Sequence, residues 1–217
     1  MALIRKQDTS PAPPAEQRRR ERNGETLLQQ LHDDSPMARR WAARDLVDYP
    51  HADAALAVRL LLEQELSVRE VILTSLTRLG SPVAIHALLG CLRSQDAALR
   101  NEAIVCMQQL PAEVAPIMQQ LLTCDDADLR IFAVNILGAL CHPQVEAWLI
   151  HVLQHDTHVN VCAAALDLLA EVGTRQSLAA IGLARQRFAE QPYICFAADL
   201  ALKRVTESGA PDGKPVD

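Results

Sequence analysis

The chain has 217 residues, of which 49% are hydrophobic but only 3% aromatic, and its formal net charge is −6. Ala and Leu supply most of the apolar side chains, a mixture that favours closely packed helices over β-sheets. The acidic balance argues against nucleic-acid binding by the body of the protein, because nucleic-acid binders usually present a basic face. Apolar runs stay shorter than a membrane-spanning helix needs, so the sequence predicts no membrane span.

Residues 1–22 differ from the rest of the chain. They hold six basic and three acidic residues, several prolines and no apolar periodicity, which is typical of a disordered tail. The segment lacks an apolar signal-peptide core, so we expect a reduced, cytoplasmic protein. Its basic run leaves tail-driven nucleic-acid binding as one alternative function. The opening residues MALIRKQ are either an ordinary flexible start or a docking segment for a partner.

A sequence phrase built around one Arg recurs every 30 or 31 residues through the first four copies. Its Arg slot holds Arg39, Arg69, Arg100 and Arg130, and two degenerate copies place Cys162 and Cys195 there. The residues three positions later are Ala42, Ile72, Ala103, Ala133, Ala165 and Ala198, and further apolar residues follow at offsets of seven and ten. These offsets fall on one face of an α-helix, so the copies predict six helices that each bury that face.

A second amphipathic stretch precedes each copy, and Pro or Gly turn signals separate the resulting helix pairs. The first helices of the pairs are predicted at 24–32, 52–63, 82–92, 112–122, 143–153 and 174–188. Asp96, Asp126 and Asp156 stand just before second helices, where a carboxylate can cap the helix and complement its dipole. The predicted fold is therefore an all-α, right-handed α-solenoid of six antiparallel helix pairs. It spans residues 23–206 between the disordered tail 1–22 and a flexible tail 207–217.

This phrase resembles the short HEAT-like repeat, about thirty residues long, of the phycobilin-lyase type of bacterial HEAT proteins. The resemblance covers residues 24–205 and specifies the fold better than the function. In that family the Asp and Arg of the phrase form a structural ladder between neighbouring repeats. The matching residues here are Arg39, Arg69, Arg100, Arg130, Asp34, Asp96 and Asp126, with Glu65 replacing Asp in the second copy. Cys162 and Cys195 break the ladder, which predicts a more apolar stacking at those two repeats.

Candidate chemistry is sparse. His151, His155, His158 and Cys162 have the spacing of one helix face, but a turn is predicted at 156–157, so we expect no zinc site. Cys106 and Cys141 lie in apolar contexts without an activated-thiol motif, and phosphate-binding glycine loops are absent from the sequence. These observations predict no catalytic residue, no metal and no cofactor, and hence a protein that is not an enzyme.

The exposed face of the second helices is the predicted binding surface. Offsets of one, five and eight from the Arg slot lie together away from the core and should line the concave side of the stack. The predicted partner-binding residues are Asn101, Val105, Gln108, Ile131 and Asn135, with Phe196 and Leu200 at the last repeat. Apolar side chains where solvent is expected mark interaction sites. Phe196 and Leu200 alternatively cap the final repeat or support a homo-oligomer.

The main functional hypothesis is a non-catalytic adaptor, scaffold or assembly factor that holds a protein partner on this face. The family resemblance implies a second hypothesis, a bilin lyase-like or chromophore-handling subunit. The two differ in that the second requires a chromophore, which absorbance after co-expression would reveal.

Overall fold

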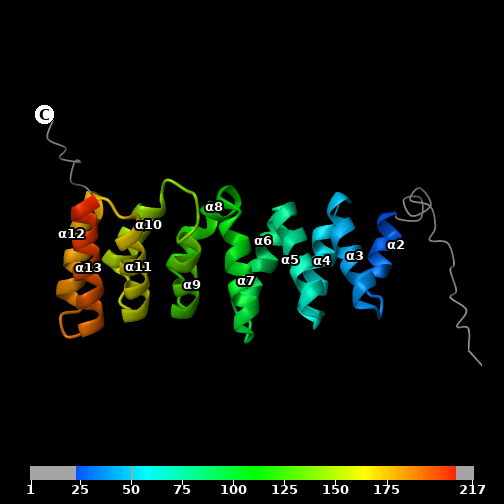
Figure 1. Cartoon of the computed structure of the whole chain (residues 1–217), viewed down its shortest axis with the longest axis horizontal. Helices are drawn as coiled ribbons and strands as arrows, with labels where there is room; N and C mark the ends of the chain where they lie inside the picture. The colour runs from blue at the N-terminus through cyan, green and yellow to red at the C-terminus, as the bar shows by residue number, and fades with distance from the viewer. Residues whose placement is uncertain (1–22, 50, 209–217) are drawn as a thin grey trace, which may run out of the picture. The chain divides into compact units, whose positions relative to one another are not determined.

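The computed structural model describes residues 23–49 and 51–208, and helices joined by short turns and loops make up this part of the chain (Figure 1). Twelve α-helices and two short 3-10 helices occur within it, with no strand in the described ranges. The chain divides into two compact units at the bond between Ser75 and Leu76. No helix among the described residues is long and apolar enough to cross a membrane. The tail predicted at 1–22, including the MALIRKQ segment, lies outside the described residues.

The N-terminal unit contains two helix pairs. Its elements are α2 (Gly24–Gln30), α3 (Pro36–Asp45), the 3-10 helix η1 (Leu46–Asp48), α4 (Ala52–Leu62) and the first part of α5 (Leu66–Leu79). Asn23 caps α2 by accepting a hydrogen bond from the Thr26 amide at 2.8 Å. The α3 segment ends sooner than its sequence phrase predicts, because the chain tightens into η1 before Tyr49 takes an extended conformation.

The C-terminal unit continues the alternation. Its elements after the end of α5 are α6 (Pro82–Cys91), α7 (Ala97–Gln108), α8 (Pro111–Leu122), α9 (Ala127–Leu137), α10 (Val145–His155), α11 (Val159–Val172), η2 (Arg175–Ser177), α12 (Leu178–Arg187) and α13 (Pro192–Ser208). The second helices α7, α9, α11 and α13 pack successively on one another, and so do the first helices α6, α8, α10 and α12. Two helical layers result, and repeating helix pairs of this kind form the predicted HEAT-like solenoid. The last helix reaches Ser208, which is two residues beyond the predicted boundary at 206.

The side chains three positions after the Arg slot confirm the predicted core. All six, Ala42, Ile72, Ala103, Ala133, Ala165 and Ala198, are 0% exposed. Small residues at these positions let neighbouring helices approach closely, as close packing of a protein interior requires. The phrase weakens at the end of α11, where Val172 is 42% exposed and borders a surface pocket instead of the core.

Two of the aspartates predicted as caps do cap helices. Asp96 accepts from the amides of Ala98 and Leu99 at the start of α7, at 2.9 and 3.4 Å. Asp126 does the same at the start of α9. Asp156 departs from this role, because α11 begins three residues later and its N-cap residue is His158. The Asp156 carboxylate instead forms an ion pair with Arg130, with Nε and Oδ2 2.6 Å apart.

The first arginine of the ladder has a different partner from the one that the resemblance implies. Arg39 donates from Nε and Nη2 to the two carboxylate oxygens of Glu63, each at 2.8 Å. Glu63 lies at the end of α4 in the next repeat and also accepts from Arg59 at 2.8 Å. The bridging acid is therefore Glu63, and neither Asp34 nor Glu65 takes that role with its side chain. The hydrogen bond from Arg39 is the main reason that the pKa of Glu63 is lowered to about 2.

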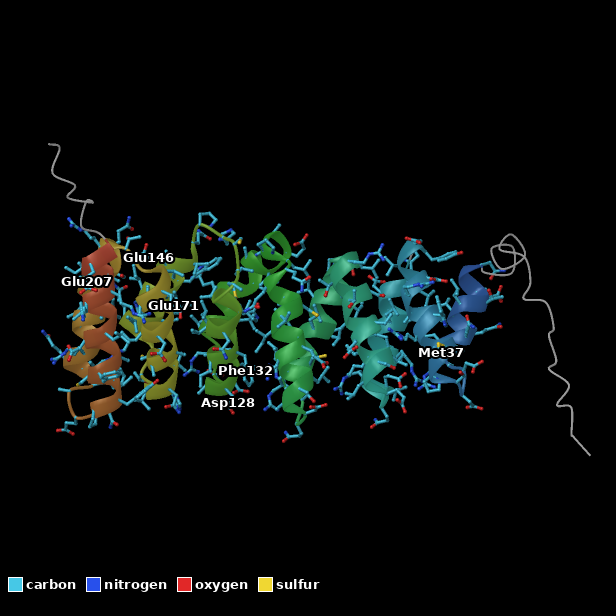
Figure 2. All side chains as sticks on the ribbon, in the orientation of Figure 1. Met37, Asp128, Phe132, Glu146, Glu171 and Glu207 are labelled. Carbon is cyan, nitrogen blue, oxygen red and sulfur yellow. The ribbon has the colours of Figure 1, made fainter. Side chains whose placement is uncertain are left out.

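The other ladder arginines are held in different ways. Arg69 is buried, with 7% of its surface exposed. Arg100 donates to the backbone oxygen of Ser94 in its own repeat at 2.6 Å, and its guanidinium lies 5.6 Å from the ring centroid of Phe132, which Figure 2 labels. Arg39, Arg100 and Arg130 therefore make different contacts, which are an ion pair with Glu63, a hydrogen bond to the backbone of Ser94 and an ion pair with Asp156.

Candidate functional site

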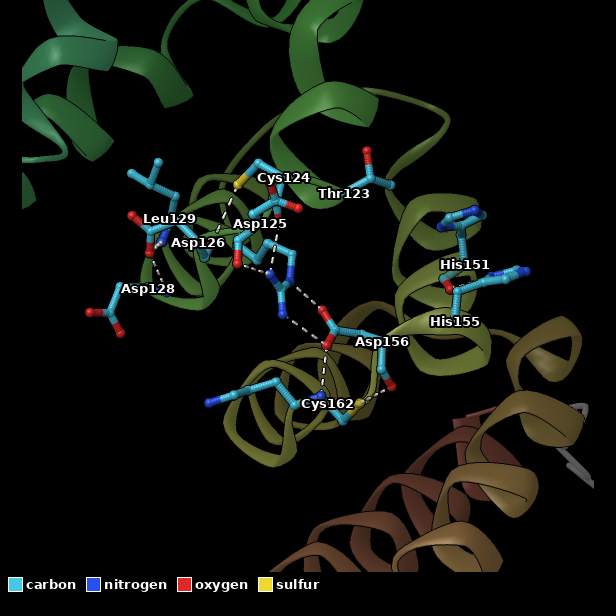
Figure 3. A network of polar contacts seen from close by, with 12 residues as sticks. Thr123, Cys124, Asp125, Asp126, Asp128, Leu129, His151, His155, Asp156 and Cys162 are labelled. Atoms are coloured by element: carbon cyan, nitrogen blue, oxygen red, sulfur yellow. Dashed lines mark hydrogen bonds and ion pairs between the residues drawn. The ribbon is translucent and has the colours of Figure 1, made fainter.

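A polar surface pocket of about 340 Å³ lies in the C-terminal unit, where the turns after α8 and α10 come together (Figure 3). Its lining combines a thiol, two imidazoles, a guanidinium, carboxylates and hydroxyl groups. The lining residues are Leu122, Thr123, Cys124, Asp125, Arg130, His151, Val152, His155, Asp156 and Thr157. We refer to it as the α8–α10 pocket. The pocket thus brings several chemically reactive groups together.

The Arg130–Asp156 pair forms one wall of the α8–α10 pocket. Arg130 donates from Nε to Asp156 Oδ2 at 2.6 Å and from Nη2 to Oδ1 at 3.2 Å. Its Nη1 donates to the backbone oxygens of Cys124 and Asp125 at 2.7 and 3.1 Å. The hydrogen bond with Asp156 is the main cause that raises the pKa of Arg130. Because these bonds occupy most of its donors, Arg130 fixes the wall more than it offers charge to a ligand.

Next to this wall, Arg187 donates hydrogen bonds to the backbone of the turn before α11, as the arginine of the Arg slot does in the fourth repeat. Cys162 occupies the Arg slot and is 0% exposed, and its burial raises the pKa of the thiol. Arg187 Nη2, from the end of α12, donates to the backbone oxygens of Leu153 and Asp156 at 2.9 and 2.8 Å and to Cys162 Sγ at 3.4 Å. The expectation of a more apolar stacking at this repeat is therefore wrong, because a guanidinium enters from the next repeat.

The two imidazoles of the α8–α10 pocket come from successive turns of α10. The rings of His151 and His155 stack with their centroids 4.2 Å apart, one above the other in Figure 3. Partial burial, and secondly the charge of His155, lower the pKa of His151. This imidazole is therefore neutral at neutral pH and able to accept a proton.

The turn predicted at 156–157 separates His158 and Cys162 from the stacked pair of His151 and His155. The helix α10 ends at His155, and His158 precedes α11 as its N-cap residue. Cys162 is buried on α11 beneath the turn. Within residues 23–49 and 51–208, no group of three or more His, Cys, Asp or Glu side chains is placed to hold a metal ion.

The cysteines divide into buried and accessible groups. Cys106 is buried, which raises the pKa of its thiol and fits the apolar context predicted for it. Cys141 was expected in the same context but is exposed, because it lies in the irregular loop between α9 and α10. Cys124 is half-buried and lines the α8–α10 pocket, with Sγ 3.5 Å from the backbone oxygen of Asp126. Cys124 could not be recognised from the sequence as part of a site, because its polar turn carries no thiol motif.

The predicted partner-binding face is only partly exposed. Asn101 and Asn135 are exposed, and Val105 is 53% exposed. Ile131 is half-buried, so it does not project freely into solvent as predicted. Gln108 is also half-buried and donates from Nε2 to the backbone oxygen of Asn135 at 2.9 Å, which ties α7 to α9.

The last repeat exposes two aromatic side chains. Phe196 is 66% exposed, whereas Leu200 is half-buried. Tyr193, which is not among the predicted partner-binding residues, is 60% exposed, and its hydroxyl donates to Asp167 Oδ2 on α11 at 3.1 Å.

Comparisons with known proteins identify the repeat and one curated relative. A family model described as HEAT repeats matches residues 24–108 and 114–186. The bilin biosynthesis protein PecE of Mastigocladus laminosus is 31% identical over 147 residues, which are 66% of this chain and 54% of PecE. The chain thus spans about half the length of the curated relative that it matches.

The solved structures that match have lower sequence identity to this chain. The complex of CpcE and CpcF of phycocyanin lyase from Nostoc sp. PCC7120 aligns with 94% of this chain and 100% of that chain, at 16% identity and a TM-score of 0.37. A designed armadillo repeat protein in complex with the peptide (KR)4 aligns with 85% of this chain and 100% of that chain, at 15% identity and a TM-score of 0.39.

These findings confirm one prediction and overturn another. The expected relation to HEAT repeats of the phycobilin-lyase type is confirmed by the family match and by PecE. The prediction that the protein is not an enzyme is wrong, because the curated relative is a bilin biosynthesis protein. That prediction depended on missing catalytic motifs, and a solenoid can assemble reactive groups from successive turns without a contiguous motif.

Proposed function

This protein belongs to the HEAT-repeat family, and we propose that it is a chromophore-handling subunit of a bilin-lyase-type enzyme that acts with a protein partner. The observation that carries the proposal is the 31% identity to the bilin biosynthesis protein PecE over 66% of this chain. The matched region is long enough to include several repeats, so the similarity extends beyond one helix pair. This reading replaces the adaptor without chemistry as the main hypothesis.

The chemistry of the α8–α10 pocket supports a role with such a substrate. A bilin is an open-chain tetrapyrrole with pyrrole nitrogens, carbonyl groups and carboxylates, so handling it requires hydrogen-bonding groups and groups that exchange protons. The pocket presents the hydroxyl-bearing Thr123, the thiol of Cys124 and the imidazoles of His151 and His155. The lowered pKa of His151 favours its neutral form, which is the form that a general base needs.

The exposed part of the predicted binding face supports contact with a protein partner. We propose that Asn101, Val105, Gln108, Ile131 and Asn135 contact the partner, with Phe196 and Leu200 as a second contact at the last repeat. Val105 is 53% exposed one helical turn after the exposed Asn101, and Phe196 is 66% exposed. A few large side chains often supply most of the binding energy of a protein interface.

Chromophore retention tests the proposed function. When the protein is produced in bacterial cells that also make a bilin, we expect the purified chain to keep visible bilin absorbance through gel filtration. Cells without the bilin-making enzymes provide the matched control and should yield a colourless protein. A colourless protein from the bilin-making cells would contradict the proposal.

The partner face is tested by Val105→Glu. Because Val105 is largely exposed, we expect unchanged helicity and a change in unfolding free energy within about 0.5 kcal/mol. In the complex, however, the glutamate charge would be buried at the partner interface, so the variant should no longer capture the native partner. Pull-down from source cells with mass spectrometry measures this capture. Gln120→Glu, on an exposed position of α8, adds the same charge to the other helical layer and should leave capture intact. Wild-type capture by Val105→Glu would exclude this face.

A further inference from the structure

A second pocket lies in the N-terminal unit and combines apolar side chains with arginines. It has a volume of about 190 Å³ and is lined by Met37, Arg40, Trp41, Arg44 and Val71. We refer to it as the Trp41 pocket. Met37, labelled in Figure 2, is 60% exposed and Trp41 is 41% exposed, while Val71 is half-buried. Large apolar side chains that gather on a surface mark a binding site more often than isolated ones do.

The helix α3 explains why these groups share one surface. Met37, Trp41 and Arg44 follow one another at spacings of four and three residues, which places them along one stripe of an α-helix. Arg40 precedes Arg44 by one helical turn on the adjoining stripe. Val71, on α5, supplies the other wall of the Trp41 pocket.

The arginines give the rim of the Trp41 pocket a positive charge. The Arg44 guanidinium carbon lies 4.2 Å from the centroid of the Trp41 ring, and Nε donates to Asp45 Oδ1 at 2.8 Å. Arg40 is exposed and makes no ion pair with any residue of 23–49 or 51–208. The pocket lining thus holds two guanidinium groups, of which Arg44 is paired with Asp45. A guanidinium binds carboxylates through paired hydrogen bonds.

We propose that the Trp41 pocket binds one end of a planar, conjugated ligand that carries carboxylates, an inference that rests on the bilin role proposed above. The ring packs on Met37, Trp41 and Val71, and the carboxylate pairs with Arg40 and with the terminal nitrogens of Arg44. A volume of 190 Å³ is below the range of about 300–1,000 Å³ for sites that enclose a whole small molecule. The pocket therefore holds part of a tetrapyrrole and leaves the rest outside.

Two probes separate the ring contribution from the carboxylate contribution. Biliverdin is an open-chain tetrapyrrole with two free carboxylates, and its dimethyl ester has the same rings without those charges. Each is titrated into the purified full chain and followed by visible absorbance. In a Trp148→Phe background, quenching of the remaining tryptophan reports binding near Trp41, because the chain has two tryptophans.

We expect wild type to bind biliverdin and to bind the ester about 10- to 100-fold more weakly, as loss of a charged hydrogen bond implies. In the Trp148→Phe background, biliverdin should quench the fluorescence of Trp41. Arg40→Gln combined with Arg44→Gln should weaken biliverdin binding by a similar factor and leave binding of the ester unchanged. Trp41→Ala should weaken both probes in the absorbance titration.

Matched controls test whether the effect is local. Arg93→Gln with Arg204→Gln removes two exposed charges outside the Trp41 pocket, and Leu61→Ser removes an apolar side chain that is 74% exposed in the same unit. Both control proteins should bind biliverdin like wild type, and circular dichroism verifies that every variant is folded. The proposal is overturned if wild type does not bind biliverdin, if the pocket variants bind it equally well, or if the control arginine pair weakens it as much.

The outcomes also separate this inference from the proposed function. If pocket variants and wild type are equally coloured after production in bilin-making cells, the bilin role stands and the Trp41 pocket is not the site. If wild type binds biliverdin through the Trp41 pocket but is colourless from those cells, the ligand class stands and the bilin role fails. If the Trp41 pocket instead binds an aromatic side chain of a protein partner, neither biliverdin nor its dimethyl ester should bind there.

Discussion

Glu63→Ala is expected to lower the free energy of unfolding by about 3–5 kcal/mol, because it breaks a buried ion pair and leaves its cations unpaired. The Glu63 side chain is 0% exposed and lies between Arg39 and Arg59, with Arg39 only 9% exposed. Its Oε1 also accepts from the backbone amides of Gln64 and Glu65, at 3.1 and 3.0 Å. Urea unfolding followed by circular dichroism measures the loss.

The control for Glu63→Ala is a matched pair at the surface. Arg185 and Asp199 also form a two-bond ion pair, with distances of 2.6 and 3.1 Å, but their side chains are 45% and 55% exposed. Asp199→Ala should lower stability far less than Glu63→Ala does, because exposed ion pairs gain little over hydration. Equal losses for the two variants would show that burial of Glu63 does not determine the effect.

The same carboxylate makes stability depend on pH. Its pKa is lowered from 4.5 to about 2 in the folded chain, first by the hydrogen bond from Arg39. Because the folded pKa lies below the unfolded one, the stabilisation is complete above pH 4.5 and is lost as the pH falls towards 2. The shift corresponds to about 3 kcal/mol. Glu63→Gln should therefore flatten the acid limb of stability against pH, and an unchanged limb would exclude Glu63 as its source.

Ala133→Asp is expected to destabilise the C-terminal unit by about 4 kcal/mol or more, because a carboxylate would be buried without a partner. Ala133 is 0% exposed on α9, a helix that packs against α7, α8 and α11. Thermal unfolding should show a lower midpoint and a less cooperative transition. Ala147→Asp places the same charge at an exposed position of α10 and should change stability by about 0.5 kcal/mol. Wild-type melting of Ala133→Asp would refute the assigned core face.

The helices and their buried faces could be predicted because helical periodicity depends on near neighbours in sequence. Ala133 and its counterparts occupy fixed offsets in a short repeat, and the structure buries all of them. The bridging acid could not be predicted in the same way. Long arginine side chains reach several positions of the next turn, so only the folded chain selects Glu63 for Arg39.

The candidate sites were harder to predict than the fold for a related reason. The α8–α10 pocket joins Cys124 to His151 and His155 across two different turns, and no single segment carries that pattern. The Trp41 pocket draws most of its residues from α3, so its stripe of Met37, Trp41 and Arg44 was readable in principle. The predicted ladder and the predicted binding face lie at other offsets of the same helix, so neither prediction includes this stripe.

Because Arg187 at the end of α12 binds the turn after α10, the fifth repeat depends on the sixth for part of its structure. The fourth repeat holds its own turn with Arg130, whereas the turn after α10 relies on Arg187 from the following pair. A variant shortened after residue 173 would therefore lose more than two helices, because the backbone oxygens of Leu153 and Asp156 would lose their guanidinium donor. In a stack whose stability is a sum of neighbouring interfaces, fraying of the last pair would loosen the turn beside the α8–α10 pocket. The terminal repeat thus covers the end of the core and also holds the turn that forms part of the α8–α10 pocket.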